Sequence, residues 1–195
     1  MLPNGIRILT SSFRHTNAVS IIFLFGAGSR YETPELAGAS HLFEHMLFKG
    51  TPERPTPRAI SEVVEGVGGT LNAFTDREVT GYWCRLAQPN YRDGIDLLSD
   101  MTLNSIFREE DIAKEKQVVY EEIRASFDSP AARASMLLDD LLWPDQPMGR
   151  DIAGSVKSVE AISRDEMCKY LETQYVGSNT VIAIAGNIEH EDVVD

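Results

Sequence analysis

The segment from Leu36 to Phe48 constrains the fold most, because it combines a helical apolar pattern with a pair of histidines. His41 and His45 lie four residues apart, so a helix stacks both imidazoles on one face. Gly50 follows where a helix would stop. The apolar residues at helical spacing are Leu42, Phe43, Met46 and Leu47. The segment therefore predicts a helix whose two imidazoles can reach one metal ion.

The residue types in this motif favour zinc. A catalytic zinc takes three protein ligands and leaves its fourth position to water, and His41 and His45 supply two of the three. Glu44 emerges near the same face, where it can act as the general base toward a zinc-activated water. The order H-x-x-E-H is an inverted form of H-E-x-x-H and is typical of zinc peptidases. The alternative is that two surface histidines make ordinary polar contacts, which is how we interpret His15 and His190.

A charged stretch from Arg108 to Phe127 contains the candidates for a third ligand. Its content of Glu, Lys and Ala predicts a helix. Glu115 and Glu122 are seven residues apart and therefore share one face. The residues alone leave open whether these glutamates bind metal or form a solvated face. The only two cysteines, Cys84 and Cys168, are too far apart in sequence to suggest a thiolate site.

The remaining pattern predicts one α+β domain over residues 1–195, with a mainly antiparallel sheet covered by helices. Thr56 followed by Pro57 indicates a helix start, as does the capping box opened by Ser163. Strands are expected at 6–10, 19–25, 70–75, 80–86 and 181–185, helices at 36–48, 57–64, 91–103, 108–127, 131–142 and after 163, and a loop at 143–154.

Composition bounds the class of partner. The formal net charge of −12, from 30 acidic and 18 basic residues, argues against a nucleic-acid or anionic-membrane binder and suits a metal cation or a basic peptide. The apolar runs are far shorter than the roughly 20 residues that span a bilayer. An export signal is not visible at the amino terminus, so a cytoplasmic location is expected.

Several motifs in order resemble the pitrilysin-type family of inverted-motif zinc peptidases, which includes mitochondrial processing peptidases and bacterial processing proteases. The stretch Glu115 to Ile123 is similar to that family's E-R-x-V-V-x-x-E-I pattern, with Lys116 in place of the usual Arg. As in the family, 76 residues separate His45 from Glu122. Further shared stretches are Leu2-Pro3-Asn4-Gly5, Phe48-Lys49-Gly50-Thr51, Gly68-Gly69, Asn72-Ala73-Phe74-Thr75, Met148-Gly149-Arg150 and Ile152-Ala153-Gly154.

The resemblance implies roles that the residues alone do not fix. It assigns Glu122 as the third ligand of one zinc ion and Glu115 as a supporting carboxylate that orients the site. It also implies that an extended peptide substrate adds as a strand to an edge strand, the alternative being an internal hairpin strand. The substrate-binding residues on that strand would be Leu71, Asn72, Ala73, Phe74 and Thr75.

The family is built from pairs of α/β units that close like a clamshell, and this chain resembles only the N-terminal, metal-bearing unit. We therefore expect a second homologous unit as partner, fused or separate. The expected function is a zinc-dependent endopeptidase that hydrolyses extended peptides or presequences. One alternative is a catalytically impaired fragment, or a partner or scaffold subunit of the same fold. Another is an unrelated metal-binding fold with a chance motif, which a Glu122 far from the histidines would favour.

Overall fold

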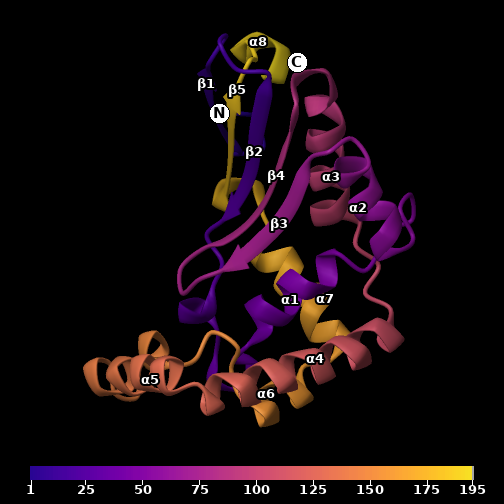
Figure 1. Ribbon diagram of the computed structural model, residues 1–195. Coiled ribbons are helices and arrows are strands. Elements are labelled where there is room, and N and C mark those ends of the chain that lie inside the picture. The colour runs from indigo at the N-terminus through magenta and orange to yellow at the C-terminus, as the bar shows by residue number, and fades with distance from the viewer. Residues whose placement is uncertain (195) are drawn as a thin grey trace.

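A five-stranded sheet forms the framework of the computed structural model, which describes residues 1–194 (Figure 1). The strand order is β1-β5-β2-β4-β3. The strands are β1 (Arg7–Ser12), β2 (Ala18–Phe25), β3 (Thr70–Thr75), β4 (Thr80–Ala87) and β5 (Thr180–Gly186). Strand β1 is parallel to β5, whereas the other three pairings are antiparallel. The mainly antiparallel α+β fold predicted from the sequence is confirmed.

The two faces of the sheet have different surroundings. Side chains alternate between the faces, so Ile21 and Phe23 of β2 and Tyr82 of β4 are buried on the helix-covered face. On the opposite face Leu9 of β1 is 60% exposed. Strand β3 lies at the end of the strand order and pairs only with β4 within the described residues. Its outer edge is therefore open to another strand.

Helices cover one face of the sheet and extend beyond the lower end of its strands, the foot of the sheet (Figure 1). Helix α3 packs against β2 and β4, and α1 contacts β3, α4 and α7. The helices are α1 (Ala39–Leu47), α2 (Pro57–Glu65), α3 (Tyr91–Asn104), α4 (Glu109–Asp128), α5 (Pro130–Leu142), α6 (Val156–Ala161), α7 (Arg164–Gln174) and α8 (His190–Val194). Helices α6 and α8 were not predicted. Within residues 1–194, none of the helices is both long and apolar enough to cross a bilayer.

Two predicted helix starts are confirmed by their caps. The Thr56 hydroxyl accepts a hydrogen bond from the Ala59 N–H, and Ser163 forms a reciprocal capping box with Glu166. The predicted start of the histidine helix at Leu36 was wrong. Leu36 belongs to a 3₁₀ turn, and Gly38 breaks the helical path because its φ is 94°.

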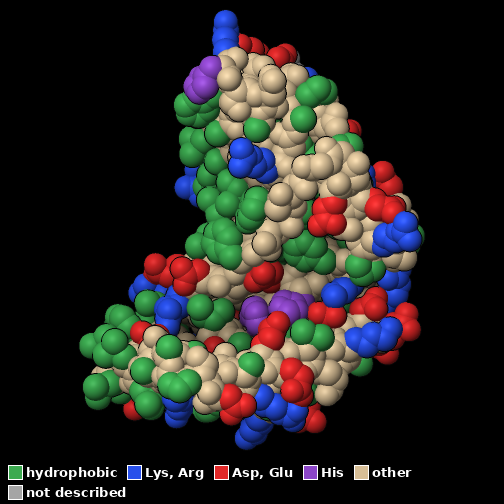
Figure 2. Space-filling model, viewed as in Figure 1, with side chains coloured by type: hydrophobic (Ala, Val, Ile, Leu, Met, Phe, Trp, Pro, Cys, Tyr) green, Lys and Arg blue, Asp and Glu red, His purple; other side chains and the backbone are tan. Residues whose placement is uncertain are grey.

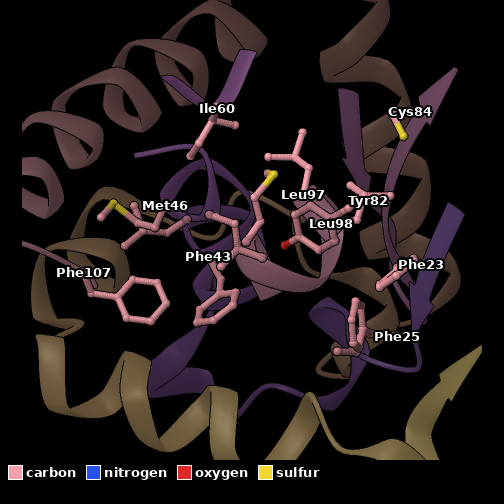
Figure 3. Packing of buried hydrophobic residues seen from close by; sticks show 14 of the residues in the cluster. Phe23, Phe25, Phe43, Met46, Ile60, Tyr82, Cys84, Leu97, Leu98 and Phe107 are labelled. Atoms are coloured by element: carbon pink, nitrogen blue, oxygen red, sulfur yellow. The ribbon is translucent and has the colours of Figure 1, made fainter. Parts of the chain in front are cut away.

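The apolar face of α1 forms part of the core. Phe43 and Met46 lie beside Phe107, which is two residues before the start of α4 (Figure 3). Phe43 also contacts Tyr170 of α7, with ring centroids 5.9 Å apart. Burying large side chains of this kind contributes about 1.5–3 kcal/mol each. The core therefore holds α1 firmly, with its histidine face toward α4.

Candidate metal centre

The histidines of α1 and a glutamate of α4 meet at the foot of the sheet. Figure 2 shows histidine side chains next to acidic ones in the hollow between the sheet and α4. His41 Nε2 lies 3.6 Å from Glu122 Oε2, and His45 Nε2 lies 3.7 Å from the same oxygen. Helical spacing brings the two imidazoles together, and the crossing of α4 under α1 adds the carboxylate. Glu122 therefore lies close to both histidines. The interpretation as an unrelated fold with a chance motif required it to lie far away.

The donor set fits zinc. One donor atom from each of His41, His45 and Glu122 lies within 4.8 Å of the others. Tetrahedral zinc with bonds of about 2.1 Å separates its ligand atoms by about 3.4 Å, close to the two distances above. Glu122 Oε2 is a buried atom without a hydrogen-bond partner among the described residues, although the side chain is 44% exposed. Such an atom between two imidazole nitrogens is accounted for by a shared cation.

The protonation of His41 supports this interpretation over an ion pair. Burial, together with the nearby charge of His45, lowers the pKa of His41 to about 4. His41 is therefore neutral near pH 7, so its approach to Glu122 is not a salt bridge despite the short distance. Neutral imidazole is the form that binds metals.

Glu115 lies behind His45. Its Oε2 is 3.1 Å from His45 Nδ1, and its Oε1 is 2.6 Å from Lys49 Nζ. Glu115 is only 8% exposed, so the ammonium group of Lys49 provides the charge that a buried carboxylate needs. A carboxylate acceptor at Nδ1 places the ring proton there and leaves the Nε2 lone pair facing Glu122.

Glu44 is held at the other side of α1 by the end of β3. The Thr75 hydroxyl donates a hydrogen bond of 2.5 Å to Glu44 Oε2. Burial raises the pKa of Glu44 and the charge of Glu122 adds to that, whereas the Thr75 hydrogen bond and His45 lower it. A carboxylate with a raised pKa accepts a proton more readily at neutral pH.

The five residues Leu71 to Thr75 all lie in β3, as predicted. Thr75 reaches the centre through Glu44, whereas the rest extend away along the open edge of the sheet. Phe74 is 38% exposed. The edge-strand position is thus present, and it leads directly to the candidate metal centre.

Sequence reasoning missed two residues of the site. Lys49 was noted only within a shared stretch, although its position four residues after His45 could have suggested a group on the same side. Glu32 was not considered at all. It lies six residues before Gly38, and its side chain reaches the start of α1. The sequence did contain a signal for this role. The helix has no Ser, Thr, Asp or Asn at its N-cap, and an acidic residue lies in the turn before it.

Comparison with known proteins agrees with this geometry. Residues 7–156 match the sequence model of the insulinase family, peptidase family M16. The chain is 38% identical over 193 residues to an uncharacterized zinc protease of Rickettsia bellii, and 38% identical over 197 residues to a probable beta subunit of the mitochondrial-processing peptidase of Arabidopsis thaliana. These matches cover 99% and 100% of this chain but 47% and 36% of the relatives.

Solved structures give the same picture for the fold. A protease from Helicobacter pylori matches with a TM-score of 0.93 at 23% identity, over 99% of this chain and 46% of that one. An M16-like peptidase from Alicyclobacillus acidocaldarius matches with a TM-score of 0.89 at 26% identity, again over 99% and 46%. The chain thus spans about half the length of the relatives it matches, or less.

Proposed function

Because this chain belongs to the insulinase family of peptidases, we propose that it is the metal-bearing unit of a zinc-dependent endopeptidase acting on extended peptides. The observation that carries the proposal is the convergence of His41 Nε2 and His45 Nε2 on Glu122 Oε2, at 3.6 and 3.7 Å. Zinc proteases among the relatives support the choice of metal.

The proposal gives each group of the centre one role. His41, His45 and Glu122 would hold one zinc ion, which would supply a Lewis acid that lowers the pKa of a water molecule. Glu44 takes the proton from that water and later returns it to the leaving amine. Thr75 holds Glu44 in place through its hydroxyl. Glu115 orients His45 through Nδ1.

We further propose that the substrate pairs with the open edge of β3. An added strand would use the unpaired backbone groups of Leu71 to Thr75, as in other cases of β-strand addition. Since Thr75 ends the strand at Glu44, a peptide bound there would run directly into the centre. Backbone pairing requires an extended chain, so peptides or presequences are the preferred substrate class over folded proteins.

The lengths of the relatives support a requirement for a second homologous unit, fused or separate, since they are about twice as long as this chain or longer. The open edge of β3 and the hollow beside the centre would leave a bound substrate exposed to water on this unit alone. We therefore expect the 195-residue chain to bind zinc but to cleave slowly by itself. The alternative, a catalytically impaired or scaffold subunit, is disfavoured by the complete set of His41, Glu44, His45 and Glu122.

The test combines metal analysis with a peptide assay. The purified chain is loaded with zinc, dialysed and analysed for metal, and its cleavage of quenched fluorescent peptides is compared with and without a chelator. One zinc per chain and slow, chelator-sensitive cleavage are expected. Failure to retain zinc would refute the proposal. Zinc retention without any cleavage, even when the second homologous unit is supplied, would favour the scaffold alternative. Rapid turnover by the monomer would refute the need for a second unit.

A further inference from the structure

Helix α1, which carries both histidines, has no cap from its own N-terminal residue. Its N-cap is Gly38, which has no side chain to accept a hydrogen bond from the first turn. The first N–H groups of any helix lack intrahelical partners, and here they are buried. Other residues must therefore satisfy the start of the helix.

The side chain of Glu32 does this from outside the helix. Its Oε2 accepts from the Gly38 N–H at 2.8 Å. Its Oε1 accepts from the Ser40 N–H and from the Ser40 hydroxyl, both at 2.6 Å. Glu32 is only 6% exposed, and burial raises its pKa while these hydrogen bonds lower it. A buried carboxylate is tolerated when its oxygens are satisfied in this way, and a negative charge suits a helix N-terminus.

Two further contacts support Glu32 and its hydrogen-bond partner Ser40. Tyr170 Oη of α7 lies 2.7 Å from the Ser40 hydroxyl, which itself donates to Glu32. The Arg150 guanidinium donates through Nη2 to the backbone carbonyl of Glu32 at 2.6 Å. The start of α1 is thereby connected to α7 and to the loop that contains Arg150.

Close backbone packing holds that loop against the start of α1. A Cβ on Gly154 would lie 2.2 Å from the Ala37 carbonyl oxygen, and a Cβ on Gly38 would lie 2.5 Å from the Ala153 carbonyl oxygen. Both glycines have positive φ, of 72° and 94°. The stretch Met148 to Gly154, which had no function assigned from the sequence, thus acts on the first residues of α1.

The start of α1 determines where the histidines point. Successive residues of an α-helix are related by a fixed rotation of about 100°, so the backbone position held at Gly38 and Ser40 sets the direction of the side chains in the first turn. Ser40, which makes two of the three contacts to the Glu32 carboxylate, is the residue immediately before His41. Fixing Ser40 therefore fixes the direction of His41.

We propose that Glu32 is a positioning residue that sets the start and rotation of α1, and so aligns His41 and His45 with Glu122. The inference rests on the proposed zinc site. Glu32 makes no hydrogen bond to the three candidate ligands, and its carboxylate acts on α1 through the N–H groups of Gly38 and Ser40 and the Ser40 hydroxyl. Arg150 and Tyr170 support it from outside.

The test replaces Glu32 with glutamine, which keeps the size but leaves one oxygen to accept hydrogen bonds. The amide NH₂ would then face the N–H donors of α1. Zinc affinity is measured by competition with a chromogenic chelator, and cobalt substituted at saturation reports ligand geometry by its visible absorption. Loss of outer support typically weakens metal binding by about 10- to 100-fold, and that fall is expected for Glu32→Gln together with an altered cobalt spectrum. Glu35→Gln is the matched control, because Glu35 lies three residues away in an exposed turn and should change neither.

The outcomes separate this inference from the proposed function. If the wild-type chain retains no zinc, the zinc proposal fails and this inference fails with it. If the wild type binds zinc and Glu32→Gln binds it equally with an unchanged cobalt spectrum, only the positioning role of Glu32 is overturned. Should Glu32→Gln not fold, Tyr170→Phe, which removes only the outer hydroxyl, is expected to lower zinc affinity by a few-fold, and no change would overturn the role.

Discussion

The two histidines of the candidate metal centre are supported very differently. His45 is held through Nδ1 by Glu115, which is held in turn by Lys49. His41 Nδ1 is buried and has no hydrogen-bond partner among the described residues. Both rings come from the same helix, and their centroids are 4.8 Å apart. A side-chain partner thus orients one imidazole directly, whereas the other has no partner on its ring and depends on the position of α1.

The same asymmetry separates the two glutamates of α4. The Glu115 side chain is 11% exposed and has two charged or polar partners, whereas the Glu122 side chain is 44% exposed and its Oε2 has no hydrogen-bond partner in the described chain. One side of the centre is therefore organised by the protein itself, and under the proposed function the other side would gain its remaining contacts from the zinc ion. Substitutions on the two sides of the centre, and at Glu44 beside it, test this contrast.

Removing a ligand should have the largest effect. For His45→Ala we expect complete loss of retained zinc after dialysis, because two remaining donors are too few for a stable site. Activity should be lost with the metal. Metal analysis of the dialysed variant checks this, with His15→Ala, an exposed histidine outside the centre, as the control. Full zinc retention by His45→Ala would contradict the ligand assignment.

The next effect separates the base from the ligands. Glu44→Gln leaves His41, His45 and Glu122 in place, so zinc content should not change. Hydrolysis should fall by about 100-fold or more, because the amide cannot accept the proton. Cleavage is measured at saturating peptide on samples of equal zinc content. Loss of zinc in this variant would make Glu44 a ligand and would contradict its role as the base.

The sequence was sufficient for the parts of the centre that depend on local spacing. The i, i+4 histidines and Glu44 follow from helical geometry, and β3 was predicted with its observed bounds. The choice between Glu115 and Glu122 could not follow from spacing, because both lie on one face of α4. Only the position at which α4 crosses α1 decides which carboxylate meets the Nε2 atoms, and that was inferred from the family resemblance.

Long-range pairing was the other limit. The β5 strand inserts between β1 and β2 and pairs Arg7 with Val181, which no local pattern reveals. The helix start at Ala39 instead of Leu36 depended on the backbone angle of Gly38 and on Glu32, both of them tertiary effects. Local periodicity was therefore sufficient to predict most helices and strands. The strand order and the start of α1 depend on contacts between segments that local patterns do not reveal.

An intermediate effect is expected on the organised side of the centre. Glu115→Gln should weaken zinc binding by about 10- to 100-fold, because His45 loses a charged acceptor and Lys49 its partner. Glu121→Gln on the same helix is the control, since Glu121 is exposed and pairs with Arg124 instead of with the centre. Equal zinc affinity in the two variants would show that Glu115 does not support the site.

The smallest effect concerns the metal-free chain and tests the less supported side. The pKa of His41 is lowered from 6.5 to about 4 in the fold, so between these values the unfolded chain binds a proton that the folded chain does not. Protonation of His41 therefore destabilises the fold as the pH falls from about 6.5 toward 4, with a slope of at most about 1.4 kcal/mol per pH unit.

Glu32 and Glu44 have raised pKa values and change stability in the opposite sense, so the wild type alone does not isolate the effect of His41. Urea unfolding of the metal-free wild type and of His41→Gln at several pH values isolates it by difference. Parallel stability curves would mean that His41 is not buried in its neutral form, and the contrast with His45 would then lose its physical basis.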